Sequence, residues 1–141
     1  MGRIRLELPQ KFDFSTEIPV RFSDLNAGAH LAHEKVLQLA EEARLAFIRQ
    51  LGFADMSIDG TRFAVSDATV LYKSRAFYGQ VLRIDIAVRD FGRKTCDFFH
   101  LITHTATGRE VARMKVGIVF FDYETQRMTN VPASFRAMFS S

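Results

Sequence analysis

The chain has 141 residues, of which 48 % are hydrophobic and 25 % charged, with a formal net charge of +3. This length suits one domain, 1–141, with a hydrophobic core that the fourteen phenylalanines can fill. A single cysteine, Cys96, excludes an intramolecular disulfide, which fits a cytoplasmic location. No Lys/Arg run indicates nucleic-acid binding, and the longest apolar segment, near residues 36–48, contains too many polar side chains for a membrane span.

The first predicted elements are a strand over residues 14–22, where apolar and polar residues alternate loosely, and a helix over residues 31–51. Gly52 is a plausible end for the helix. Helical spacing is followed by Val36, Leu39, Ala40, Ala43, Phe47 and Leu51. The apolar stripe is widened by Leu37, Leu45, Ala46 and Ile48. We therefore expect a helix that is buried on most sides.

Four further strands are predicted after the helix. They cover residues 63–76, 80–91, 94–105 and 110–124, and short glycine-containing turns join them as in an antiparallel sheet. The second of these strands has the clearest alternation, with one face formed by Leu82, Ile84, Ile86 and Val88. The tail, residues 132–140, is a candidate short helix that starts at Pro132.

This order predicts an α+β fold in which a curved antiparallel sheet of about five strands wraps round one long central helix. The strands are long and apolar, so an unpaired sheet edge would be prone to association. We therefore expect a homodimer, or a homotetramer built from two dimers.

The loop before the helix, "SDLNAGAH" at residues 23–30, is the most informative motif. Together with "EEAR" on the helix, it resembles the hotdog-fold thioesterases, in particular the 4-hydroxybenzoyl-CoA thioesterase-like group. That group's loop reads roughly Asp-x-Asp-x-x-Gly-His-Val-Asn-Asn. Asp24 matches the first Asp, and His30 matches the His. The chain departs from the pattern at three positions, which are Asn26 for the second Asp, Ala29 for the Gly and His33 for an Asn.

The resemblance implies a hotdog fold and an acyl-CoA thioesterase, with the thioester carbonyl held by the backbone amide of His33 at the helix N-terminus. Asn26 occupies the position of a nucleophile or general base, but an amide does not titrate usefully, so it can only hold a water or orient the substrate. His30 can act as a base near neutral pH, and it could be replaced by Glu34, or by Asp67 if that residue crosses a dimer interface into the site. Each of these residues also has a structural interpretation as a turn, helix-start or surface residue.

The phosphates of coenzyme A are assigned by the resemblance to a basic turn with Arg93 and Lys94, and less strongly to Lys73 and Arg75. Coenzyme A is then part of the substrate, an acyl thioester, and no separate cofactor is expected. His100 and His104 share a strand face without a third evident ligand, so no metal site is expected. Asn26 also leaves open a non-catalytic module that binds acyl-CoA or an acyl carrier protein.

Overall fold

The computed structural model describes residues 3–53 and 57–139, and its elements follow the predicted order. The strands are β1 (Phe14–Pro19), β2 (Ser57–Ile58), β3 (Thr61–Tyr72), β4 (Val81–Arg89), β5 (Thr95–His104) and β6 (Glu110–Asp122). The helices are a short 3-10 turn (Phe22–Asp24), α1 (His33–Gln50) and α2 (Ala133–Phe139). Residue 140 of the predicted tail helix lies outside the described residues. β2 was not predicted, because two residues are too few to show a period.

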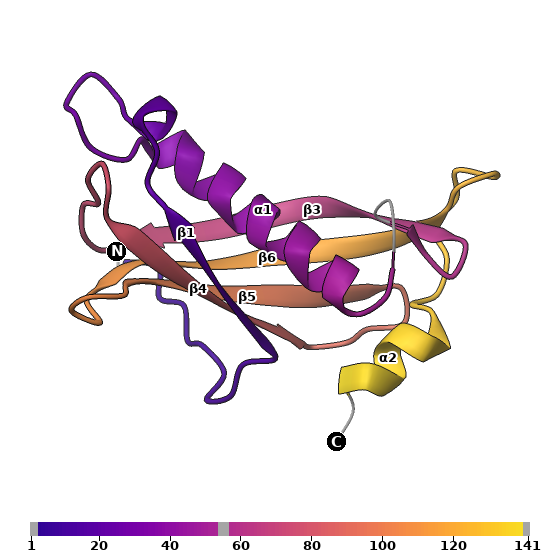
Figure 1. The fold of residues 1–141 in the computed structure, drawn as a ribbon. Helices are drawn as coiled ribbons and strands as arrows, with labels where there is room; N and C mark the ends of the chain where they lie inside the picture. Colours follow the sequence, from indigo (N-terminus) through magenta and orange to yellow (C-terminus); the bar gives the residue numbers. More distant parts are fainter. Residues whose placement is uncertain (1–2, 54–56, 140–141) are drawn as a thin grey trace.

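The six strands form one antiparallel sheet in the order β1-β4-β5-β6-β3-β2. The sheet curls, and α1 lies diagonally across one of its faces, with its N-terminus at one end of the sheet and α2 at the other (Figure 1). The predicted α+β class and the curved sheet round one long helix are therefore confirmed. This arrangement leaves the loop before α1 at one end of the sheet, beside the turn that joins β3 to β4.

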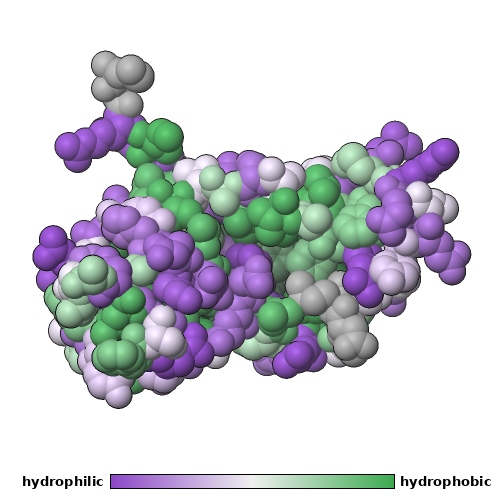
Figure 2. All heavy atoms as spheres, turned by 90° about the horizontal axis from the view of Figure 1, so that it is seen from above, coloured by the Kyte–Doolittle hydropathy of each residue, from purple (hydrophilic) through white to green (hydrophobic). Residues whose placement is uncertain are grey.

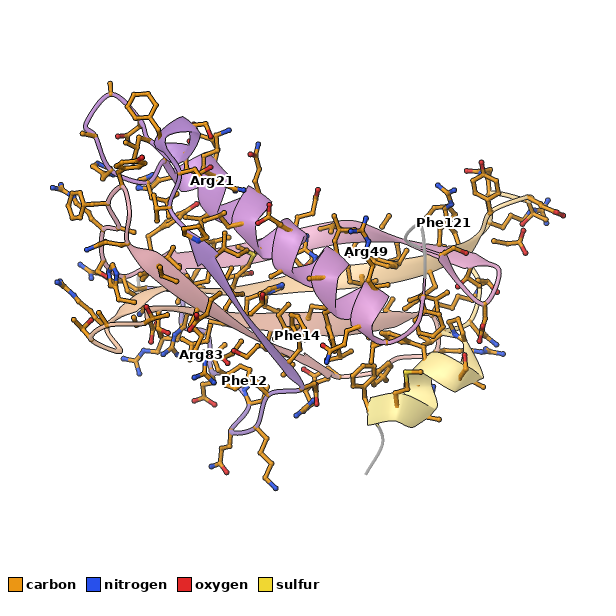
Figure 3. All side chains as sticks on the ribbon, viewed as in Figure 1. Phe12, Phe14, Arg21, Arg49, Arg83 and Phe121 are labelled. Carbon is orange, nitrogen blue, oxygen red and sulfur yellow. The ribbon has the colours of Figure 1, made fainter. Side chains whose placement is uncertain are left out.

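The core lies between α1 and the inner face of the sheet. The four predicted inward residues of β4 are all fully buried in it, as the alternation indicates: Leu82, Ile84, Ile86 and Val88. Phenylalanine rings fill the end near α2, where Phe135 contacts Phe98 and Phe120. Phe14 of β1, which is labelled in Figure 3, stacks on Phe47 of α1 with ring centroids 5.0 Å apart, and this contact fixes the helix against the edge of the sheet.

The prediction that α1 is buried on most sides is wrong within the single chain. The sheet covers one side of the helix, and the buried positions follow a single stripe. Leu37, which is 40 % exposed, and Ala46 lie outside that stripe. The apolar stripe is thus wider than the surface that this sheet can cover. Among residues 3–53 and 57–139, no helix is long and apolar enough to cross a membrane.

Residues 3–13, here called the N-terminal arm, lie on the side of the sheet away from α1 (Figure 1). Leu6 packs with Ala87 and Phe99, which point to this outer face, and Leu8 and Phe12 pack against the same cluster. Arg113 donates a hydrogen bond to the carbonyl of Leu6, and Arg89 donates one to the carbonyl of Lys11. The arm therefore covers part of the outer face with apolar side chains.

Candidate active site

A hollow of about 320 Å³ opens at the N-terminus of α1, between the loop before the helix and the segment that follows β3. Four of the residues that line it were predicted from the sequence, which are His30, His33, Lys73 and Arg75. Tyr72, at the end of β3, also lines it and was not predicted. The fold therefore brings together residues that are about forty positions apart in the chain, and it does so within one chain.

The first turn of α1 presents unpaired backbone amides beside this hollow. The N-cap is Ala32, whose side chain cannot accept a hydrogen bond, and among the described residues the amides of His33 and Glu34 have no hydrogen-bond partner. These N–H groups and the positive end of the helix dipole favour a negatively charged oxygen. The start of α1 can therefore stabilise an oxyanion without any contribution from the side chain at position 33.

His30 has one ring nitrogen engaged and one without a hydrogen-bond partner among the described residues. Its Nδ1 lies 3.2 Å from the carbonyl oxygen of Leu31, which can only accept, so Nδ1 is the donor and Nε2 is the nitrogen left to act as an acceptor. The ring lies close over Gly28, where an added Cβ would come within 3.2 Å of Nε2. The backbone of His30 also forms a β-bridge with Phe77. The loop thus holds an imidazole in the tautomer that can accept a proton.

Asn26 belongs to the loop that supports His30 rather than to the lining of the hollow. Its Oδ1 accepts hydrogen bonds from the amides of Gly28, at 2.9 Å, and His30, at 3.4 Å. Its side chain therefore closes a turn, which is the structural interpretation of this residue. Ala29 adopts a left-handed conformation with a φ of 62°, which explains why the related loops have a glycine at this position.

Asp24 has a structural role at the other side of the loop. It is buried, and its Oδ2 accepts hydrogen bonds from the backbone amide and from Nε of Arg21. Arg21 lies beside the N-terminal half of α1 and also binds Glu42 through Nη1 at 3.2 Å (Figure 3). The loop is therefore tied to α1 by an Asp–Arg–Glu chain, in which Asp24 caps the loop.

The two alternative acids do not line the hollow of their own chain. Glu34 is exposed on the first turn of α1. Asp67 lies in the middle of β3 at a β-bulge, where it accepts a hydrogen bond from Ser66. The Asp67 carboxylate lies over Gly117, where an added Cβ would be only 2.0 Å from Oδ1. Gly117 thus makes room for the Asp67 carboxylate, which is held in the sheet.

Arg93 and Lys94 lie at the opposite end of the sheet from this hollow. The carbonyl of Arg93 accepts a hydrogen bond from Val131, just before α2, and the carbonyl of Lys94 accepts one from Phe120. The start of α1 is at the other end (Figure 1). Of the four cations that the resemblance assigns to coenzyme A, only Lys73 and Arg75 therefore lie at the hollow of the same chain.

A buried polar pair, which was not predicted from the sequence, lies between α1 and the sheet. Nη1 of Arg44 lies 3.2 Å from Nε2 of His100, and both residues are buried. Burial and the positive charge of Arg44 lower the pKa of His100 to about 3, so the imidazole is neutral and accepts the hydrogen bond. Burial also lowers the pKa of Arg44 from its ordinary value. The pair lies in the core rather than at the hollow.

Comparison with known proteins gives the family of this chain. Residues 20–139 match the family model described as the thioesterase-like superfamily. The chain therefore belongs to the thioesterase-like superfamily. It is also 31 % identical over 88 residues to YneP of Bacillus subtilis (strain 168), which carries the provisional name of an acyl-CoA thioesterase. That match covers 60 % of this chain, and the chain spans 64 % of the length of YneP.

Solved structures confirm the hotdog fold. The PA2801 protein from Pseudomonas aeruginosa, provisionally named a thioesterase, superimposes with a TM-score of 0.84 at 21 % identity, covering 92 % of this chain and all of that one. Slr0204 from Synechocystis, a 1,4-dihydroxy-2-naphthoyl-CoA thioesterase, gives a TM-score of 0.81 at 14 % identity, covering 89 % of this chain and 94 % of that one. These identities are low, so the two structures establish the fold alone.

Proposed function

We propose that this protein is an acyl-CoA thioesterase, which hydrolyses an acyl thioester to a free acid and coenzyme A. The observation that supports this most is that two kinds of catalytic group, backbone amides and an imidazole, lie at the same hollow. Unpaired amides at the start of α1 can hold a carbonyl oxygen, and His30 offers a basic Nε2. Membership of the thioesterase-like superfamily and the similarity to YneP support the same activity.

The proposed reaction uses His30 as the general base. Nε2 takes a proton from a water molecule as the water oxygen attacks the thioester carbon. The carbonyl oxygen becomes an oxyanion, which the backbone amide of His33 stabilises together with the dipole of α1. When the tetrahedral intermediate collapses, the carbon–sulfur bond breaks and the imidazolium returns its proton to the leaving thiolate. Coenzyme A leaves as the thiol, so the proposal needs no separate cofactor.

Asn26 acts in this proposal by holding the loop around His30. Its Oδ1 is engaged with two backbone amides, so any direct contact with a water or with the substrate would come from its Nδ2. Glu34 and Asp67 are second choices for the base, since both lie away from the hollow of their own chain. Either acid could take part at a hollow only if a second copy of the chain brought it there.

We further propose that the protein is a homodimer joined through β3. One side of β3 pairs with β6, whereas in the described residues its other side pairs only with β2 near Thr61. Val65 on β3 is 48 % exposed, and Leu37 on α1 is exposed as well. On the side of the molecule that is uppermost in Figure 1, hydrophobic patches lie between hydrophilic ones (Figure 2). A second β3 would pair with the part of this sheet edge that β2 leaves open. Light scattering that shows a stable monomer would exclude this assembly, and a tetramer would indicate a second interface.

The alternative function is a module that binds acyl-CoA or an acyl carrier protein without hydrolysis. The observation in its favour is that none of the carboxylate side chains in residues 3–53 and 57–139 lines the hollow, with Asn26 in place of an Asp. The two functions are separated by the release of free thiol from a panel of aliphatic and aromatic acyl-CoAs. Thiol release above the rate without protein supports the thioesterase. Tight acyl-CoA binding without thiol release from any member would instead establish the module.

A further inference from the structure

A second hollow, of about 400 Å³, adjoins the first one at Arg75, which lines both. It lies between the turn that joins β3 to β4 and the turn that joins β5 to β6. Its lining includes Phe77, Gln80, Thr107 and Arg109. A ligand whose reactive end lies at the start of α1 could therefore extend past Arg75 into this second hollow without leaving the surface of one chain.

The frame of the second hollow is held by hydrogen bonds between its two turns. His104 is buried, and its Nε2 lies 3.1 Å from the carbonyl oxygen of Arg75. The amide of Thr105 donates to the carbonyl of Val81 at 3.1 Å. Gln80 closes the first turn, because its Oε1 accepts from the amide of Phe77 at 2.8 Å. The backbones that carry Arg75 and Arg109 are therefore fixed relative to each other, although both side chains are exposed.

The charge of the two adjoining hollows has a single sign. Of the residues that the structure describes, no Asp or Glu lines either of them, whereas Lys73, Arg75 and Arg109 do. Two other surface hollows contrast with them, since one is lined by Asp122 and Glu124 and another by Asp13 and Asp85. Within the described residues, the guanidinium groups of Arg75 and Arg109 form no ion pair. Both groups are therefore free to bind an anion.

An aromatic ring lies at the same hollow as the two arginines. Phe77 is 45 % exposed, although a ring of this size is normally covered. An exposed ring beside guanidinium groups suits a ligand that combines a flat base with phosphates, because the base can stack on the ring while the phosphates take charge-assisted hydrogen bonds. A thioester of coenzyme A has such a nucleotide end, separated from the reacting carbonyl by its pantetheine arm.

We propose that the second hollow, through Arg75, Arg109 and Phe77, binds the phosphate-bearing nucleotide end of coenzyme A. This inference rests on the proposed thioesterase function and adds where the substrate is held. It differs from the assignment of the phosphates to Arg93 and Lys94, which lie at the other end of the sheet within the same chain. If the second hollow binds the nucleotide, a substitution of Arg109 should weaken its binding. If Arg93 and Lys94 bind it, only substitution of those two residues should do so, and one experiment therefore distinguishes the two assignments.

The test measures the binding of adenosine 3′,5′-bisphosphate by calorimetry, which requires no hydrolysis. We expect Arg109→Ala to weaken binding by about tenfold or more, in line with the loss of one charge-assisted contact, and Arg109→Glu to weaken it further. Arg127→Ala is the matched control, because Arg127 is exposed on a turn outside both hollows. Equal binding by wild type and Arg109→Ala would overturn the inference, as would loss of binding only in the Arg93→Ala, Lys94→Ala variant. Equally tight binding of adenosine without phosphates would also overturn it.

A second measurement separates this inference from the proposed function. It compares kcat/KM for an acyl-CoA with kcat/KM for the same acyl group on N-acetylcysteamine, which lacks the nucleotide. The ratio of the first value to the second should fall about tenfold or more in Arg109→Ala. If the protein binds the bisphosphate through Arg109 but hydrolyses no thioester, the proposed function fails and this inference stands. If it hydrolyses acyl-CoA with an unchanged ratio in Arg109→Ala, this inference fails alone. Hydrolysis of acyl-carrier-protein thioesters only, without bisphosphate binding, would also overturn it.

Discussion

The ring of His33 stacks on the ring of Tyr72 with centroids 4.4 Å apart, and the Tyr72 hydroxyl donates a hydrogen bond of 3.2 Å to the His33 carbonyl. These two contacts join the first residue of α1 to the last residue of β3. They fix the helix N-terminus against the strand end on the opposite side of the hollow from the loop. The side chain at position 33 thus positions the helix start, while its backbone amide is left for the substrate.

Substitution of Tyr72 should therefore affect both activity and stability in a graded way. Tyr72→Phe keeps the stacking and removes one exposed hydrogen bond, so we expect a loss of stability below about 1 kcal/mol and a small change in turnover. Tyr72→Ala removes both contacts and should lower turnover more than it raises KM, because the amides of α1 would no longer be held at the carbonyl. Steady-state kinetics and thermal unfolding of both variants test this. Equal turnover in Tyr72→Ala and wild type would show that the stacking does not position the helix.

His30 should be more important for the reaction than His33, although both line the hollow. His30→Ala should lower turnover by about 100- to 10,000-fold, the range for loss of a general base. His33→Phe keeps the backbone amide and a ring that can stack on Tyr72, so its turnover should stay within a few-fold of wild type. A folded His30→Ala protein with full activity would move the base to Glu34 or Asp67.

Asn26 should tolerate a carboxylate but not a methyl group. Asn26→Asp keeps an oxygen that accepts from the amides of Gly28 and His30, so we expect it to retain or raise activity. Asn26→Ala loses both hydrogen bonds and should lower turnover by roughly ten- to a thousand-fold, as His30 is no longer held. The measurement is kcat for each variant, with circular dichroism to show that the chain is folded. Full activity in folded Asn26→Ala would show that the turn forms without this side chain.

The buried imidazole of His100 should make the folded state sensitive to acid. Its pKa is about 3 when folded, against an ordinary value of 6.5, so between these values the unfolded chain binds the additional proton. The free energy of unfolding should therefore rise with pH across this interval, by up to about 1.4 kcal/mol per pH unit, and this contribution is complete above about pH 6.5. His100→Gln can still accept from Arg44 but cannot titrate, so this part of the slope should vanish. Urea unfolding at about pH 5 and pH 7.5 tests this, and parallel slopes in the two proteins would contradict it.

The sequence predicted the elements of this fold well because their periods are long and regular. The alternation of Leu82, Ile84, Ile86 and Val88 needs a sheet with one apolar face, and all four point into the core. The prediction for α1 was wrong, because the buried face of the helix is narrower than its apolar stripe. Helical spacing shows which positions are apolar, but it does not show how many of them one sheet can cover.

The site was predicted only in part, because its residues come together through tertiary contacts. The loop motif gave His30 and His33, but nothing in the local sequence indicates that Tyr72, at the end of another strand, stacks on His33. Similarly, Arg93 follows β4 in the chain and Arg75 precedes it, so the length of that strand separates them. The motif alone could not show which of these cations lies at the hollow.

The N-terminal arm has a consequence for the geometry of any larger assembly. A second sheet that stacked on the outer face would meet Leu6, Leu8 and Phe12 before it reached Phe99 beneath them. The arm is also fastened by hydrogen bonds from Arg113 and Arg89 and by those of Asp13 with β4, so removing it would break all of these as well as uncover apolar surface. With the arm in place, we expect copies of this chain to meet along the edge of β3 rather than at the outer face, so that the sheet extends sideways instead of forming layers.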